Sequence, residues 1–184
     1  MQILSFESPN QGTSADLAQL FQDHQSLIVG TAYRVTGTRA DAEDVLQTVF
    51  MRLFKRWDKL ELSDSPGGYL RKAAVNASLD LLRARSRSKS VSIDEMTGEL
   101  EDRGSVSAER HRHDAEMRRQ LREAVAKLTE NSARIFTLRY LEEYDNKEIA
   151  KMLGMTQTAV AVVLHRARHK VREEIGDFLG GIES

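Results

Sequence analysis

Basic side chains gather in two short runs of the sequence, and these runs are its clearest candidates for binding chemistry. The first consists of Arg83, Arg85, Arg87 and Lys89, and the second of Arg166, Arg168, Lys170 and Arg172. Lysine and arginine neutralise phosphates, so each run is a candidate contact for a nucleic-acid backbone. An acidic stretch over residues 94–109 separates the runs, and the formal net charge of the whole chain is -1.

A second feature is the spacing of a helix-turn-helix over residues 147–164. Ala150 is small where two helices would cross, and Gly154 can adopt the positive φ of a tight turn. Such a unit offers the N-terminal end of its second helix to the major groove of DNA. The basic run that follows is placed to hold phosphates, although the C-terminal end of a solvated helix also favours cations.

The elements that carry these residues are predicted to be helices throughout. Apolar residues recur in steps of three and four over residues 17–35, 42–57, 69–81, 117–128, 135–141, 146–153 and 157–175. Four local signals mark expected helix starts. Two are capping boxes, at Thr13 to Asp16 and at Asp145 to Glu148. The other two are the start at Thr38 and the N-cap Ser65, which is followed by Pro66 at the first helical position. The helix that follows Thr38 is expected to bury a stripe ending in Phe54 and Trp57.

The pattern predicts an all-α fold of two small helical domains. We place the domains at residues 13–86 and 113–178, with a flexible acidic linker at residues 87–112. Serine, glycine and acidic residues replace the apolar period in that linker.

Composition and motifs argue against catalysis. The sequence has no cysteine, which excludes disulfides, thiolate metal sites and thiol nucleophiles. The histidine pairs 111/113 and 165/169 lack a third ligand in an evident position, so we expect no metal or other cofactor. No glycine loop for phosphate and no nucleophile motif is present, and we expect no enzymatic activity. Residues 1–12 lack a basic n-region and a long apolar run, so we expect a cytoplasmic protein without membrane insertion.

Three blocks of the sequence resemble the extracytoplasmic-function sigma factors, the short two-domain members of the sigma-70 family of bacterial RNA polymerase specificity subunits. Residues 27–57, with Asp-Ala-Glu-Asp at 41–44, are similar to the polymerase-binding helix pair. Residues 69–85 are similar to the helix that reads and opens the -10 promoter element, and residues 128–172 to the domain that reads the -35 element. The resemblance implies an initiation factor whose partners are core RNA polymerase and promoter DNA, with an anti-sigma factor as a candidate third partner.

The resemblance also implies roles for individual residues. The polymerase-binding set is Asp41, Glu43, Asp44, Gln47 and Arg52. The -10 set consists of four cations suited to phosphates and one amide suited to the edge of an unstacked base, namely Arg71, Lys72, Arg83, Arg85 and Asn76. Alternatives stay open, because acids at a helix start complement the helix dipole and an exposed asparagine often has no role. The acidic linker resembles the segment that passes through the polymerase cleft, and a merely solvating linker is its alternative.

The sequence departs from the family pattern at two places. Val75 stands where the family often has an arginine before the -10 asparagine. Ala161, Val162 and Val163 stand where the recognition helix usually offers lysine, serine and arginine, and they cannot donate hydrogen bonds from their side chains. We therefore assign the reading of -35 bases to the hydrogen-bonding side chains of Thr156, Gln157, Thr158 and His165, with an apolar contact from Ala161. The cations of the set are Arg166 and Arg168.

Two other functions fit the same residues less completely. One is a helix-turn-helix regulator that binds duplex DNA without polymerase. The other is a protein-interaction module whose apolar recognition helix binds a partner helix. An initiation factor binds polymerase, whereas the regulator does not. The protein-interaction module would show no salt-dependent DNA binding, even with polymerase present.

Overall fold

The structure, a computed structural model, describes residues 11–57, 66–89 and 106–182, and within them the regular elements are seven helices. These are α1 (Gln11–Thr36), α2 (Arg39–Phe54), α3 (Pro66–Lys89), α4 (Val106–Ala126), α5 (Glu130–Tyr140), α6 (Asn146–Leu153) and α7 (Gln157–Ile182). The all-α prediction is therefore confirmed. Over the described residues, none of these helices has the length and apolar character that crossing a bilayer requires.

Local signals placed several helix starts correctly. The Thr38 side chain accepts a hydrogen bond from the Asp41 amide at 3.2 Å and caps α2, while Gly37 turns the chain before it with φ of 86°. α3 begins at Pro66 as predicted, and its expected cap, Ser65, lies outside the described residues. The prediction for α1 was wrong, because this helix begins at Gln11 and runs through the segment expected to cap it.

The first three helices enclose one apolar core. Its buried members are Leu20, Ile28, Ala32, Ala42, Val45, Val49, Leu53, Leu70, Ala74 and Ala77. Phe54, which was expected in this core, is 68% exposed. Successive residues of a helix differ by about 100° in direction, so Phe54 points away from the stripe that carries Val49 and Leu53. Trp57 is partly buried against the core, in the turn after α2.

The remaining helices form the C-terminal half, in which α7 packs on α4, α5 and α6. The predicted helix-turn-helix is confirmed as α6 and α7. Asp145 and Glu148 form the expected capping box, and Gly154 ends α6 in the left-handed conformation with φ of 64°. α7 extends to Ile182, beyond the expected end near Ile175.

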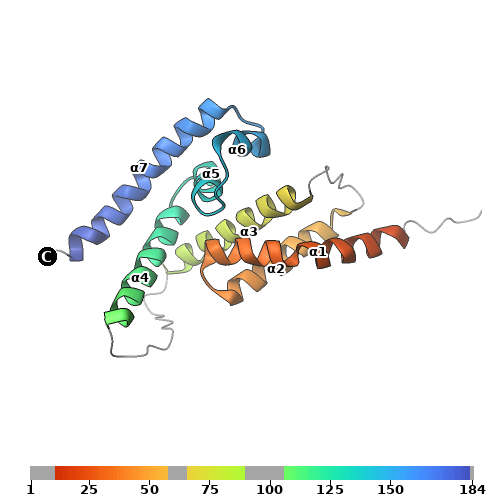
Figure 1. Cartoon of the computed structure of the whole chain (residues 1–184), viewed down its shortest axis with the longest axis horizontal. Coiled ribbons are helices and arrows are strands. Elements are labelled where there is room, and N and C mark those ends of the chain that lie inside the picture. The colour runs from red at the N-terminus through yellow and green to blue at the C-terminus, as the bar shows by residue number, and fades with distance from the viewer. Residues whose placement is uncertain (1–10, 58–65, 90–105, 183–184) are drawn as a thin grey trace, which may run out of the picture.

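α3 joins the two halves. It lies between α1 and α2 on one side and α4 and α5 on the other (Figure 1). Val35, Val75 and Leu79 are buried in the core of the C-terminal half, and we call these three residues the apolar seam. α3 continues to Lys89 and α4 begins at Val106, so both ends of the segment assigned to the linker are helical, while residues 90–105 lie outside the described residues.

Candidate polymerase and nucleic-acid interfaces

α2 presents an exposed face of mixed character. Asp44 and Gln47 are exposed, and Met51 and Phe54 follow them at the spacing of one helical stripe with 56% and 68% exposure. The sequence interpretation missed Met51 and assigned Phe54 to the core. Large apolar side chains beside polar ones are typical of a surface that meets another protein.

Glu43 and Arg52 are exposed on the same helix, and each forms an ion pair. Glu43 accepts a hydrogen bond from Arg39 at 2.9 Å, and Arg52 lies 3.3 Å from Asp80 of α3. Both pairs are solvated, so they contribute little stability and leave these side chains available to a partner.

Asp41 is separated from this exposed face. Its side chain is 1% exposed, and both carboxylate oxygens accept hydrogen bonds from Arg85 of α3. Arg122 of α4 also lies near it, and burial, followed by repulsion from Arg118, lowers the pKa of Arg122. The structure thus corrects the expectation that Asp41 shares the exposed acidic surface, because this carboxylate ties α2 to α3 and Arg85 is its partner.

Three residues of the predicted -10 set face the C-terminal half. The amide oxygen of Asn76 accepts a hydrogen bond from Arg134 Nε at 2.7 Å. Lys72 donates to the carbonyl of Met152 at 3.1 Å, and the guanidinium of Arg71 lies 5.4 Å from the ring centre of Tyr144. In this arrangement the side chains expected to bind DNA are engaged within the chain.

Arg83, the remaining cation of the -10 set, is mostly buried. Its side chain is 19% exposed and lies 4.0 Å from a carboxylate oxygen of Asp80. One of its terminal nitrogens is buried without a hydrogen-bond partner among the described residues. A buried donor of this kind is costly to leave unpaired, and Arg71 of the same set likewise has a buried Nε without a partner among the described residues, so both arginines have spare hydrogen-bonding capacity.

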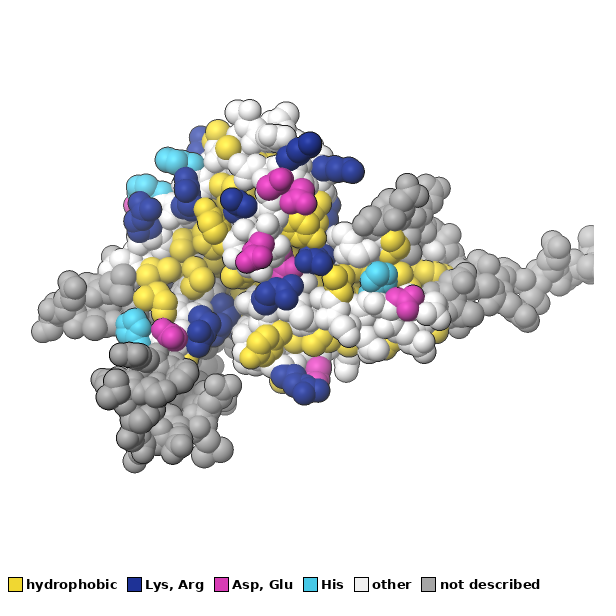
Figure 2. Space-filling view, in the orientation of Figure 1, with side chains coloured by type: hydrophobic (Ala, Val, Ile, Leu, Met, Phe, Trp, Pro, Cys, Tyr) yellow, Lys and Arg dark blue, Asp and Glu magenta, His cyan; other side chains and the backbone are white. Residues whose placement is uncertain are grey.

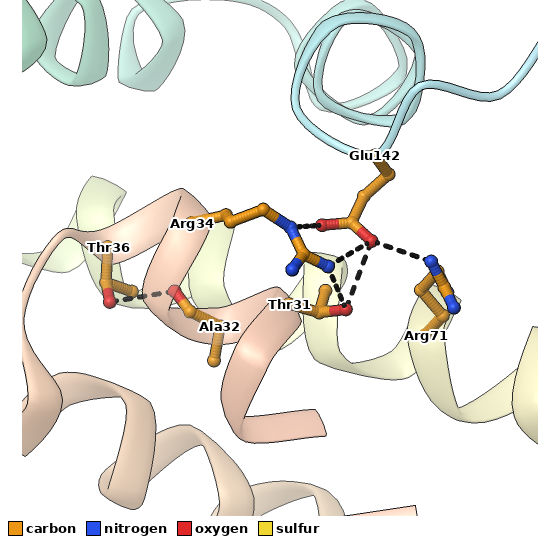
Figure 3. A network of polar contacts seen from close by, with 6 residues as sticks. All are labelled: Thr31, Ala32, Arg34, Thr36, Arg71 and Glu142. Carbon is orange, nitrogen blue, oxygen red and sulfur yellow. Dashed lines mark hydrogen bonds and ion pairs between the residues drawn. The ribbon is translucent and has the colours of Figure 1, made fainter. Parts of the chain in front are cut away.

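Glu142 is the centre of a polar network between the halves (Figure 3). Its carboxylate accepts hydrogen bonds from Arg34 at 2.8 and 2.9 Å, from the Thr31 hydroxyl at 3.1 Å and from Arg71 at 3.2 Å. The side chain of Glu142 is 0% exposed, and its hydrogen bonds raise the pKa of Arg34. Sequence reasoning missed Glu142, since nothing in local spacing relates it to α1 or α3.

The turn after α5 aims Glu142 at these cations. Glu143 adopts φ of 60°, a left-handed conformation that reverses the chain at the end of the helix. The Glu142 amide donates to Thr137 at 3.1 Å and the Tyr144 amide donates to Leu138 at 3.0 Å, which closes the helix end. The Glu142 side chain therefore projects from a well-defined turn.

Val75 has a structural role that its sequence position did not reveal. It is 0% exposed and belongs to the apolar seam. An arginine in this position would place a charge in that buried contact at considerable cost. The departure from the family pattern coincides with the place where the two halves pack together.

The recognition end of α7 is open to solvent. Gln157, Thr158 and Ala161 are exposed, as are His165, Arg166 and Arg168 further along the helix. The Thr156 hydroxyl accepts a hydrogen bond from the Ala159 amide at 3.2 Å, so this group serves as the helix cap in addition to its predicted role.

Basic side chains continue along α7. His165, Arg168, His169 and Arg172 line a hollow on this helix, and Figure 2 shows Lys, Arg and His side chains gathered along it. Arg172 belongs to the second basic run, which was predicted to hold phosphates, although it was not in the -35 set. His169 was not predicted to bind DNA, although the helical step from His165 would have placed it beside that residue.

The two halves match two models of one family. Residues 20–88 match Sigma-70 region 2, and residues 118–171 match Sigma-70, region 4. The chain belongs to the extracytoplasmic-function sigma factors of the sigma-70 family. The region 2 match runs from within α1 to near the end of α3 of this sigma factor, and the region 4 match runs from within α4 to within α7.

Similar proteins agree over nearly the whole chain. The sigma factor is 29% identical over 167 residues to an RNA polymerase sigma-E factor of Streptomyces antibioticus, covering 90% of this chain and 87% of that protein. It is 23% identical over 176 residues to the ECF RNA polymerase sigma factor SigW of Bacillus subtilis, covering 91% of each.

Two solved structures share the fold of this sigma factor. CnrH in complex with the cytosolic domain of CnrY has a TM-score of 0.51 and 18% identity, covering 90% of this chain and 91% of that one. The sigma factor RpoE in complex with the anti-sigma factor NepR from Bartonella quintana has a TM-score of 0.50 and 16% identity, and the match covers 88% of this chain and 97% of that one.

Proposed function

We propose that this protein directs core RNA polymerase to promoters and assists promoter melting during initiation. One observation carries the proposal. The N-terminal helical half matches Sigma-70 region 2, and the C-terminal half, which packs against it, matches Sigma-70, region 4. The factor itself makes no covalent bond. Its contribution is binding energy from base stacking, base-edge hydrogen bonds and phosphate pairing.

The polymerase would bind the exposed face of α2. Glu43, Asp44, Gln47 and Arg52 supply charge and hydrogen-bonding groups, and Phe54 supplies apolar area at the end of the helix. Such a mixture suits a partner surface with cations and an apolar pocket. Asp41 supports this face from inside, through its contact with Arg85.

Promoter DNA would bind at two surfaces. The exposed N-terminal end of α7 suits the major groove of the -35 element, with Arg166 and Arg168 beside it for phosphates. The face of α3 that carries Arg71, Lys72 and Asn76 suits an unpaired -10 strand. Neither alternative function, a regulator acting without polymerase or a protein-interaction module, is favoured by the family matches.

Transcription in vitro tests the proposal. Purified factor and core polymerase are incubated with a library of promoter fragments, and transcripts are sequenced. We expect a defined subset of fragments to be transcribed only when both proteins are present. If the factor neither binds polymerase at low salt nor yields any transcript, the proposal is wrong.

The polymerase face can be tested by reversing its charge. We expect Glu43→Lys combined with Asp44→Lys to weaken polymerase binding at least about tenfold, because two attractive charges become repulsive. Asp23→Lys, which changes another exposed acid of the same half, is the matched control and should retain binding. Circular dichroism would show that both proteins remain helical.

A further inference from the structure

The exposed side of α7 carries apolar residues among its polar ones. Three residues of this helix depart from the family pattern, and the structure separates them. Val163 is partly buried and packs against the C-terminal core, whereas Ala161 is exposed and Val162 is 45% exposed. One departure therefore serves the fold, and two face solvent.

Val162 lies outside the core to which its neighbours belong. Val160 and Leu164, on either side of it in the sequence, are 0% and 6% exposed and belong to the core of the C-terminal half. Valine is also a weaker helix former than alanine, because branching at Cβ restricts its rotamers in a helix. Val162 thus gains little from packing or helix propensity in the free chain, and burial against a partner is the gain open to it.

Polar and cationic side chains flank Val162 along the helix. Thr158 lies about one turn before it and Arg166 about one turn after it, and both are exposed. His165 and Arg168 line the hollow that continues along α7. A helical turn advances by about 5.4 Å and stacked bases by about 3.4 Å, so side chains one turn apart can contact neighbouring base pairs. Val162 therefore lies within the surface proposed to meet the -35 element.

The surroundings of Val162 favour DNA over a protein as the molecule that covers it. Over residues 157–168, all of which the structure describes, the exposed apolar residues are Ala161 and Val162. The core of a protein interface needs a larger contiguous apolar area. In the major groove of DNA, by contrast, each thymine presents one C5 methyl group among hydrogen-bonding atoms. A valine among cations and hydrogen-bonding side chains matches such a methyl group.

The other base edges are unfavourable opposite this side chain. Adenine and guanine present acceptor atoms in the major groove, and cytosine presents an amino donor. Valine cannot form a hydrogen bond with these atoms, and a close contact would also exclude the water that satisfies them. Such a contact selects thymine by a gain for its methyl group and by a penalty against the other bases.

We propose that Val162 is a specificity-determining residue that reads the C5 methyl group of a thymine in the -35 element, with Ala161 beside it. The inference rests on the proposed role of α7 in binding that element. The residues that lack hydrogen-bonding side chains then do not weaken recognition. They replace a hydrogen-bonded reading of one base pair by an apolar one.

Deoxyuridine tests the proposal, because it differs from thymidine only in lacking the C5 methyl group. Promoters that the factor and core polymerase select from a random library are remade with deoxyuridine at every thymidine of the -35 element. Competition then measures the affinity of core polymerase carrying the full-length factor for both duplexes. We expect about fourfold tighter binding of the thymidine duplex, which corresponds to the burial of one methyl-sized group.

Val162→Ala assigns the preference to one side chain. We expect this variant to lose most of the fourfold preference, because binding of the thymidine duplex weakens and binding of the deoxyuridine duplex changes little. The cycle formed by the protein change and the base change separates a direct contact from an effect of deoxyuridine on the duplex itself. Lys170→Ala, which changes another exposed residue of α7, is the matched control. It should weaken binding of both duplexes alike and leave the preference intact.

A methyl group on cytosine supplies the converse test. Replacing the contacted thymine by cytosine, with its paired base, should weaken binding. 5-Methylcytosine carries its methyl group at the same ring position as thymine, so it should restore part of the loss. Restoration is expected with the unmodified factor and not with Val162→Ala.

Equal affinity of the unmodified factor for the thymidine and deoxyuridine duplexes would overturn the proposal. A preference that persists undiminished in Val162→Ala would overturn it as well. Failure of the proposed function looks different, since no library fragment would then be transcribed. In that case the free factor is compared on duplexes that it selects from a random pool, because the start of α7 is exposed in the free chain. If the free factor also selects no duplex, both proposals are wrong.

Discussion

At the scale of single residues, Asp41 and Asp44 show how one residue type takes two roles on the same helix. Both are acids in the first half of α2, but Asp41 lies in the first turn, where the helix dipole favours a negative charge, whereas Asp44 lies beyond it. Asp44 is exposed, whereas Asp41 is buried against Arg85 and near Arg122. A lysine at Asp41 would bring a third cation into that site and disturb the fold, so only Asp44 permits a clean charge-reversal test.

Asn76 carries the most specific prediction at this scale. We expect Asn76→Ala to reduce open-complex formation about tenfold or more, because one base edge loses its hydrogen-bonding partner. Polymerase binding should change far less, since Asn76 lies on α3 and the proposed polymerase face on α2. Fluorescence of a base analogue in the -10 element measures opening, and co-purification measures polymerase binding.

The control for Asn76 is Asn131→Ala, which removes an exposed asparagine from α5. Neither opening nor polymerase binding should change in this variant. Equal losses of opening and polymerase binding in Asn76→Ala, or no loss of either, would count against the assigned role.

At the scale of elements, the turn between α6 and α7 depends on the backbone of one glycine. Gly154 has φ of 64°, and a Cβ atom there would meet nothing within 4 Å. The cost of Gly154→Ala is therefore conformational rather than steric, and we expect it to lower the free energy of unfolding by about 1 kcal/mol. Urea unfolding followed by circular dichroism measures this change.

Gly176→Ala gives the matched comparison. Gly176 lies within α7, and a Cβ atom there would likewise meet nothing within 4 Å. Alanine is the better helix former, so we expect this variant to be more stable by roughly 0.5–1 kcal/mol. If both alanine variants shift stability in the same direction, the conformational explanation for Gly154 fails.

At the scale of the whole molecule, α3 serves two cores at once. Leu70, Ala74 and Ala77 pack into the N-terminal core, while Val75 and Leu79 pack with the C-terminal half. A helix buried on two faces couples the elements on either side of it. The two matched regions should therefore behave as one cooperative unit in the free factor.

Calorimetry tests this coupling. We expect a single unfolding transition for the unmodified chain and two separate transitions for Val75→Lys, because a charge in the apolar seam makes closure unfavourable. Val162→Lys adds the same charge on the exposed side of α7 and should retain one transition. Two resolved transitions in the unmodified chain would contradict the predicted coupling.

The sequence by itself determined the helical class, the order of the helices, and the starts at Thr38 and Pro66. It also determined the helix-turn-helix around Gly154. These features depend on caps, turns and apolar spacing, whose physical causes lie within a few neighbouring residues.

Only the tertiary structure decided that Asp41 is buried, that Phe54 is exposed and that Glu142 contacts Arg34 and Arg71. Such contacts join residues far apart in the chain, as Glu142 and Arg34 are, and their positions follow from how whole helices pack. Local spacing carries no record of that packing, so the covered surface of α3 emerged only when both halves were seen together.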